Sequence, residues 1–144
     1  MRYLSIDYGI KRSGLAVCDP SETIISPLAV AKGRRELLEK VIALVKSENV
    51  DAVVLGLPLN MDDTQGPQAK LVLDFAGQLK EHISIPIHLQ DERLSSFTAE
   101  GKLASAEFSR SKRKERLDAV AAAEILQAFL EQKKQRGRDV HTQP

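Results

Sequence analysis

Several residue types are scarce in this chain of 144 residues, and each scarcity excludes a class of protein. The single cysteine, Cys18, cannot form an intrachain disulfide, and the three histidines lack the spacing of zinc ligands. Tryptophan is absent and aromatic residues make up 4%, which disfavours base stacking as a way of binding nucleic acid. No apolar run approaches a membrane span, and Asp7 interrupts the first one too early for a signal peptide. We therefore expect a soluble protein of a reducing cytoplasm, without membrane association, in which Cys18 is a small buried side chain.

An excess of one sign of charge is also lacking. Lys and Arg number 21 and Asp and Glu 20, so the net charge of +1 does not by itself indicate a nucleic-acid-binding protein. Hydrophobic residues reach 42%, too many for a disordered chain, and the length suits one domain with one core. We predict a single domain over residues 1–133, followed by a basic, disordered tail over residues 134–144.

The spacing of apolar residues changes along the chain and predicts an α/β fold. Short apolar runs predict strands, and spacing on one helical face predicts helices. Strands are expected over 3–6, 14–18, 23–30, 53–55 and 85–89, and helices over 37–45, 66–79, 95–108 and 117–132. Strand–helix–strand units require parallel neighbours with right-handed crossovers, whereas the first three strands suit an antiparallel meander. The sequence therefore predicts a mixed five-stranded sheet with helices on both faces.

Three carboxylates, far apart in sequence, stand where this fold would bring them together. Asp7 ends the first strand, Glu92 follows the fifth, and Asp118 shares a helical face with the apolar residues Ala122 and Ile125. A carboxylate in such a position is costly unless its charge is used. Oxygen ligands favour Mg²⁺ or Mn²⁺, and two such ions about 3.5–4 Å apart can hydrolyse a phosphodiester. These residues predict a metal-dependent site for phosphodiester hydrolysis.

Each of these carboxylates also has a purely structural interpretation. Asp7 can form a turn before Gly9, and Asp91 with Glu92 can be a solvated strand end. Asp118 can be a first-turn residue that the helix dipole stabilises by about 0.3–1 kcal/mol. The dipole explains a position near the start of a helix but does not explain placement on its apolar side. Asp118 therefore favours the interpretation as a site.

Basic residues gather immediately before Asp118. A nucleic-acid backbone bound there would be held less tightly as salt rises, whereas the structural alternative is a solvated, mobile loop. The residues concerned are Arg110, Lys112, Arg113, Lys114 and Arg116. Arg12, between Gly9 and Gly14, is a sixth candidate, able to reach a phosphate or to hold an active carboxylate. Its alternative is exposure in a plain hairpin turn.

Four segments, in order and over nearly the whole chain, resemble the YqgF family of Holliday junction resolvase-like proteins. One segment alone would be a weak match, but the four together are specific. They are Asp7-x-Gly9-x-x-Arg12-x-Gly14-x-Ala16, Gly56-Leu57-Pro58-Leu59-Asn60-Met61-Asp62, Asp91-Glu92-Arg93-Leu94-Ser95-Ser96, and Lys114-x-x-x-Asp118-x-x-Ala121-Ala122-x-x-Ile125-Leu126. The second segment departs from the family where Asp63 replaces the usual glycine.

The resemblance implies a ribonuclease H-like fold and a cytoplasmic bacterial nuclease that matures the 5′ end of precursor 16S ribosomal RNA. It implies that Asp7, Glu92 and Asp118 are the catalytic, metal-binding carboxylates, with Asp91 and Asp62 as further candidates. RNA is the favoured partner, within pre-ribosomal particles, and structured DNA is the other. The older proposal for the family is Holliday junction resolution, by analogy with the resolvase RuvC.

Other functions stay open. A non-catalytic nucleic-acid-binding factor in ribosome assembly or transcription would use the same basic segment, but it would leave the inward carboxylates unexplained. A phosphate-binding ATPase of the actin and sugar-kinase type shares the core fold, but it needs two copies of that fold and this chain has one. The oligomeric state is open between a monomer and a homodimer, since a junction resolvase cuts two strands symmetrically.

Overall fold

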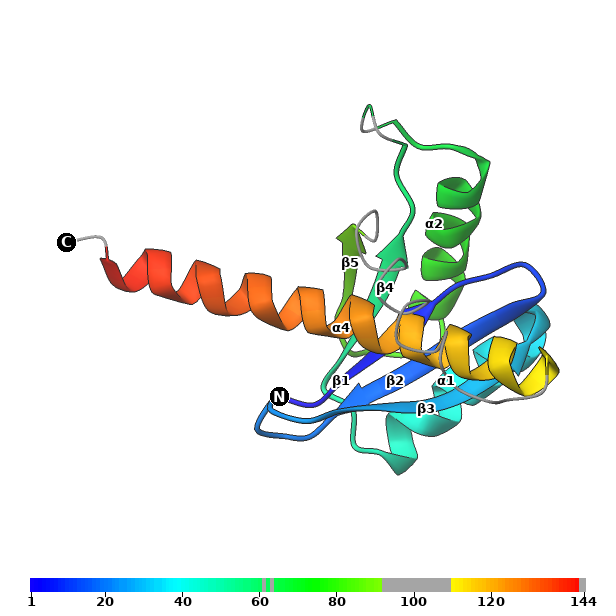
Figure 1. The fold of residues 1–144 in the computed structure, drawn as a ribbon, viewed down its shortest axis with the longest axis horizontal. Helices are drawn as coiled ribbons and strands as arrows, with labels where there is room; N and C mark the ends of the chain where they lie inside the picture. Colours follow the sequence, from blue (N-terminus) through cyan, green and yellow to red (C-terminus); the bar gives the residue numbers. More distant parts are fainter. Residues whose placement is uncertain (61, 63, 92–109, 143–144) are drawn as a thin grey trace.

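A computed structural model of the chain shows one mixed sheet with helices on both faces (Figure 1). It describes residues 1–60, 62, 64–91 and 110–142. The strands are β1 (Tyr3–Asp7), β2 (Arg12–Cys18), β3 (Ile25–Lys32), β4 (Ala52–Leu57) and β5 (Ile87–Asp91). Their order is β3-β2-β1-β4-β5. The strand β2 pairs antiparallel with both β1 and β3, whereas β4 pairs parallel with both β1 and β5. The predicted five-stranded sheet is confirmed, although β3 begins at Ile25 rather than at Thr23.

The two faces of the sheet hold separate apolar cores, because side chains alternate along each strand. Leu4 and Ile6 of β1 belong to the core beneath α1 (Gly33–Ser47) and α2 (Pro67–Lys80). Tyr3, of opposite parity, belongs to the core beneath α4 (Arg110–Thr142), which crosses the other face. Alternation along β1 therefore predicts that Asp7, which has the parity of Tyr3, lies on the α4 face.

The ends of α1 and α2 follow from local sequence. Pro67 occupies the first turn of α2, where its missing N–H costs nothing. Asn49 follows α1 with a φ of 51°, the left-handed conformation in which asparagine is tolerated and a helix stops. The stop after α1 returns the chain to the sheet for β4, and the start of α2 leads the chain on toward β5.

The last helix is longer at both ends than the sequence predicts. It was expected over residues 117–132, with a mobile basic loop before it and a disordered tail from residue 134, whereas α4 runs from Arg110 to Thr142. The physical reason is composition: Lys, Arg, Glu and Gln are strong helix formers, and Gly137 costs only about 1 kcal/mol in a helix interior. The helix expected over residues 95–108 lies outside the described residues. Within the described part of the chain, no helix combines the length and the apolar character needed to cross a membrane.

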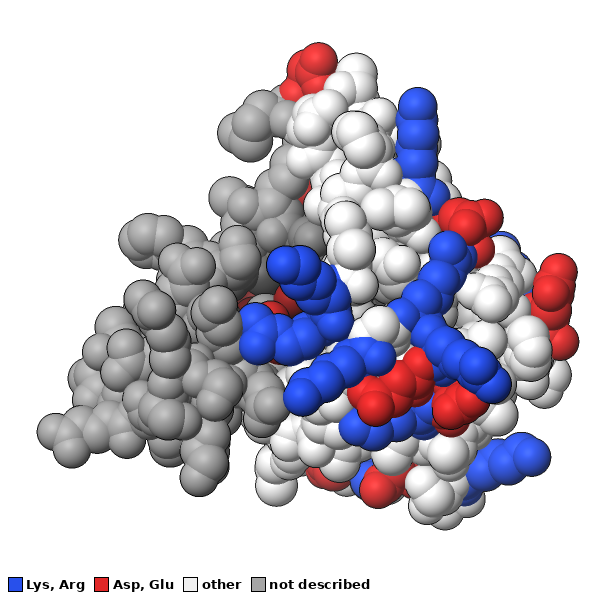
Figure 2. Space-filling model, turned by 90° about the vertical axis from the view of Figure 1, so that its right-hand side faces the viewer, with Lys and Arg blue, Asp and Glu red and all other residues white. Residues whose placement is uncertain are grey.

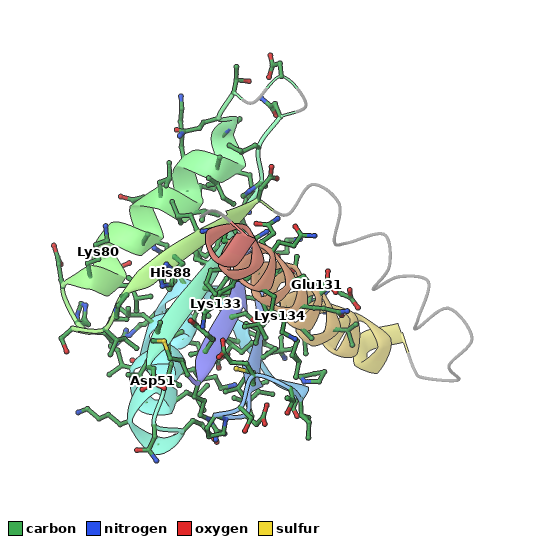
Figure 3. The ribbon with its side chains drawn as sticks, turned by 90° about the vertical axis from the view of Figure 1, so that its left-hand side faces the viewer. Asp51, Lys80, His88, Glu131, Lys133 and Lys134 are labelled. Carbon is green, nitrogen blue, oxygen red and sulfur yellow. The ribbon has the colours of Figure 1, made fainter. Side chains whose placement is uncertain are left out.

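Contacts along α4 fix its direction as antiparallel to β1. Near the start of β1, the ring of Tyr3 meets that of Phe129 edge-on at 5.1 Å between centroids, and His88 of β5 also contacts Phe129 at 5.2 Å. Lys133 Nζ donates hydrogen bonds to Glu22 Oε1 at 2.6 Å and to the Tyr3 hydroxyl at 2.9 Å (Figure 3). The second half of α4 is thereby tied to the beginning of β1, so its first half must lie over the end of β1.

Candidate active site

The backbones of Asp7 and Asp118, which carry two of the predicted carboxylates, come close to each other where β1 ends beneath α4. The Oγ of Ser5 donates a hydrogen bond of 2.7 Å to the carbonyl oxygen of Ala122. Asp7 lies two residues further along β1 on the same face, about 6.6 Å away, and Asp118 lies four residues earlier on α4, about 6 Å away. Because α4 and β1 run antiparallel, the step from Ser5 to Asp7 along β1 and the step from Ala122 back to Asp118 along α4 go in the same direction. Asp7 and Asp118 therefore lie opposite each other at the carboxyl end of the parallel strands.

Gly14 of β2 allows α4 to come this close. In the sheet, Gly14 is the register partner of Asp7. A Cβ atom added to Gly14 would lie 1.8 Å from the carbonyl oxygen of Asp118 and 2.8 Å from the nitrogen of Ala119. No side chain fits in this space, so the backbone of α4 rests directly on β2. Glycine at this position is therefore a requirement for bringing Asp118 next to Asp7.

Arg12 is the third charged group at this point. Its Nε lies 3.5 Å from Asp118 Oδ2, and the two side chains are 30% and 29% exposed. Of the sequence-based alternatives for Arg12, the structure shows the contact with a carboxylate and not full exposure in a turn. The side chains of Asp7, Arg12 and Asp118 are thus partly exposed, although Asp118 Oδ2 itself is buried.

Two further acidic candidates do not join this site. Asp91 ends β5 beside Leu57, and alternation from His88, which contacts Phe129 beneath α4, places Asp91 on the opposite face. Asp62, between β4 and α2, accepts hydrogen bonds from the hydroxyl and the backbone N–H of Thr64, which lower the pKa of Asp62. Asp62 therefore shapes its own loop.

The remaining predicted site residues fall outside what the structure describes. Glu92 is one of them, so the third member of the carboxylate trio has no described position. Arg110 to Arg116 form the first turns of α4, directly before Asp118, but the side chains of these basic residues are also outside the described set. Among the described residues, no group of three or more His, Cys, Asp or Glu side chains is placed to hold a metal ion. Asp7 and Asp118 are two of the three predicted carboxylates.

The described surface beside the site carries both signs of charge. Figure 2 shows Lys and Arg side chains interspersed with carboxylates on the side of the molecule where α1 and the beginning of α4 lie. Some charges of α1 are already paired: Arg34 lies 2.8 Å from Asp74 of α2, and Arg35 lies 3.6 Å from Glu39. Attraction of a polyanion to this side therefore depends on particular basic residues and not on a uniform field.

Sequence reasoning missed Gly14 and Ser5 as parts of the site. Gly14 was expected at the start of the second strand and in the first motif, and Ser5 in the first strand, with no role in the site for either residue. A signal for the close approach was present in the alanines at 119, 121, 122 and 123 of α4, which leave little bulk toward the sheet. The facing glycine could be identified only once the register of β2 against β1 was known.

Relatives of known name are similar to this chain over most of its length. A protein of Syntrophomonas wolfei named "Putative pre-16S rRNA nuclease" is 42% identical over 133 residues, covering 91% of this chain and 94% of its own. A protein of Maridesulfovibrio salexigens with the same name is 39% identical over 132 residues, covering 90% and 98%.

Solved structures of two resolvases share the fold. A fowlpox virus resolvase in complex with Holliday junction DNA superposes with a TM-score of 0.57 at 16% identity, covering 92% of this chain and 98% of its own. RuvC of T. thermophilus in complex with a Holliday junction substrate superposes with a TM-score of 0.55 at 17% identity, covering 92% of this chain and 96% of its own. At such low identity the likeness concerns the fold alone, and it confirms the ribonuclease H-like architecture. Residues 1–132 also match a family described as RuvX, Holliday junction resolvase. RuvX and YqgF are names of the same family, whose four motifs the sequence resembles, and the chain therefore belongs to it.

Proposed function

We propose that the protein is a metal-dependent endonuclease that hydrolyses phosphodiester bonds and processes the 5′ end of precursor 16S ribosomal RNA. The observation that carries this proposal is the close approach of the Asp118 backbone to Gly14, the register partner of Asp7 at the carboxyl end of β1. Two carboxylates from distant parts of the chain repel each other, so their juxtaposition costs free energy unless a cation uses it. The names of the relatives support the same chemistry.

The described donors suit a hard divalent cation. Both carboxylates supply oxygen, the ligand type that Mg²⁺ and Mn²⁺ prefer, and the site is open enough for water to complete the coordination. Asp7 and Asp118 would hold the ion, with Glu92 as the third ligand. When bound, such an ion makes water a stronger nucleophile and stabilises charge on the phosphate. The protein's own part is to orient the carboxylates on two rigid elements and to bind the phosphates through Arg12 and the basic first turns of α4.

The substrate proposed here is RNA, bound in a pre-ribosomal particle in the cytoplasm. The names of the relatives favour RNA, whereas the description of the family favours a four-way DNA junction as the second candidate. The two differ in what they demand of the protein. Symmetric cleavage of a junction needs two active sites and therefore a dimer, whereas processing one RNA end is possible for a monomer or a homodimer.

The decisive experiment compares both substrates under the same conditions. Labelled precursor of small-subunit ribosomal RNA and a four-way DNA junction are each incubated with Mg²⁺, Mn²⁺ or EDTA. We expect RNA cleavage that requires metal and that falls at least about 100-fold in Asp7→Asn and in Asp118→Asn, the scale of losing one electrostatic stabiliser. Asp74→Asn, which changes an exposed carboxylate on α2, is the matched control and should cleave normally.

Each other outcome assigns a different function. Cleavage of the junction alone would favour the resolvase. Wild-type cleavage that survives in both site variants would refute the assignment of the carboxylates. Salt-sensitive binding of RNA without any cleavage would identify a non-catalytic nucleic-acid-binding factor.

A further inference from the structure

Arg12 and a metal ion would compete for the same carboxylate. The guanidinium Nε lies 3.5 Å from Asp118 Oδ2, across the contact between β2 and α4. Both side chains are about 30% exposed as a whole, but Asp118 Oδ2, the oxygen that faces Arg12, is itself buried. A buried carboxylate oxygen favours a cation beside it, so a metal ion can take the place of the guanidinium when Arg12 leaves. This exchange changes the charge that the site offers to a cation.

The charges of the three described groups show the size of this change. With Arg12 turned toward Asp118, the two carboxylates and the guanidinium sum to −1. With Arg12 turned away, the sum over the two carboxylates alone is −2, so the change is one unit of charge whatever other groups contact them. A divalent cation binds more tightly in the second arrangement.

A phosphate is the group best suited to turn Arg12 away. The planar guanidinium has five N–H donors in a fork that matches phosphate oxygens, and a bound nucleic acid brings phosphates to the edge of this site. Arg12 lies at the beginning of β2, so its backbone is held in the sheet opposite Lys32 while its side chain exchanges partners.

We propose that Arg12 is a positioning residue that pairs with Asp118 in the free protein and with a substrate phosphate in the complex. Metal and nucleic acid then bind cooperatively, and by thermodynamic linkage each raises the affinity for the other by the same factor. The metal is held weakly until substrate is present. This inference rests on the proposed function, because it takes the same site to bind metal and phosphodiester.

The first test measures Mn²⁺ affinity by calorimetry, without substrate and without turnover. Arg12→Gln should bind Mn²⁺ about fivefold more tightly than wild type, the scale of a partly exposed ion pair. Lys11→Gln is the matched control: it removes the same charge from the neighbouring, exposed residue, and its affinity should stay within about twofold of wild type. Arg12→Lys keeps the charge and should resemble wild type, which guards against a folding defect in Arg12→Gln.

The second test measures coupling by fluorescence anisotropy of a labelled precursor-RNA fragment, with Ca²⁺ or EDTA. Ca²⁺ prefers a larger and less regular coordination shell than Mg²⁺, so we use it to report binding in place of cleavage. In wild type, Ca²⁺ should raise RNA affinity about fivefold or more, the same scale as the metal-affinity change. In Arg12→Gln the enhancement should fall below about twofold, because the guanidinium that the substrate would turn away from Asp118 is already absent.

The proposal is overturned if Arg12→Gln binds Mn²⁺ no more tightly than wild type, including the case in which neither binds it. An equal Ca²⁺ enhancement in both proteins also overturns it. Failure of the proposed function looks different: Arg12→Gln would bind Mn²⁺ more tightly while no variant cleaves RNA. Conversely, metal-dependent cleavage with unchanged Mn²⁺ affinity in Arg12→Gln refutes only the role of Arg12.

Discussion

Adding one methyl group to Gly14 should disable the site while leaving every charged residue in place. In Gly14→Ala the new Cβ would lie 1.8 Å from the carbonyl oxygen of Asp118, whereas ordinary contact begins at 3.4 Å. Cβ atoms essentially never come closer than 3.0 Å to such an atom, so α4 and β2 must separate by more than 1 Å. The atoms that the new Cβ would meet belong to the backbone of a helix, so no flexible side chain can absorb this shift.

Two magnitudes follow from that displacement. Overpacking of this kind costs about 1–3 kcal/mol of the free energy of unfolding. A displacement of about 1 Å in a catalytic group can reduce the rate about 100-fold, so we expect at least that loss of cleavage. The cleavage rate should therefore be largely lost while the protein stays folded, because the core beneath α1 and α2 does not depend on this contact.

The assay pairs urea denaturation with the rate of RNA cleavage under saturating Mg²⁺. Gly77→Ala is the matched control, since nothing lies within 4 Å of the added Cβ in the exposed interior of α2. Alanine there should stabilise the protein by about 0.5–1 kcal/mol and leave cleavage unchanged. Wild-type cleavage and stability in Gly14→Ala would refute the claim that this close approach positions Asp118.

Three other outcomes follow from contacts that do not involve Asp7, Arg12 or Asp118. Ser5→Ala removes the buried hydrogen bond to Ala122 and should cost about 0.5–1.5 kcal/mol in urea denaturation; an unchanged midpoint would contradict this. The backbone N–H of Ile24 is the largest cause that lowers the pKa of Asp19 to about 2 from its usual 3.8, so this carboxylate stabilises the fold above about pH 4 and loses that effect as pH falls toward 2. The thermal midpoint of Asp19→Asn should therefore vary less with pH than that of wild type between pH 4 and 2, and parallel curves would argue against it. Burial raises the pKa of Cys18, which is 1% exposed, so a thiol reagent should react slowly with the native protein and quickly in urea, whereas fast native labelling would contradict its burial.

The fold was largely predictable because its elements have strong local signals. Apolar runs and helical spacing located the five strands, α1 and α2, and the order of elements allowed only a mixed sheet with right-handed crossovers. The exception is α4, whose polar ends were interpreted as a loop and a tail. Amphipathic spacing detects the part of a helix that packs against the sheet. It gives no signal in the polar ends of α4, where helix propensity is the remaining indication in the sequence.

The candidate site was predictable in composition and not in geometry. The positions of Asp7 at a strand end and of Asp118 on an apolar helical face were visible in the sequence. Their proximity depends on three facts that no local pattern contains: the register of Asp7 with Gly14, the hydrogen bond from Ser5 to α4, and the direct contact of the helix backbone with β2.

The sequence by itself determined which residue types are available for chemistry: carboxylates, arginines and lysines, with neither the cysteines nor the histidines of a zinc site. The tertiary structure alone decided which of them meet. It set Arg12 against Asp118 and turned Asp91 to the other face of the sheet. The physical reason is that residue spacing encodes the period of one element, whereas contact between elements is decided by strand register and by how closely two backbones can approach.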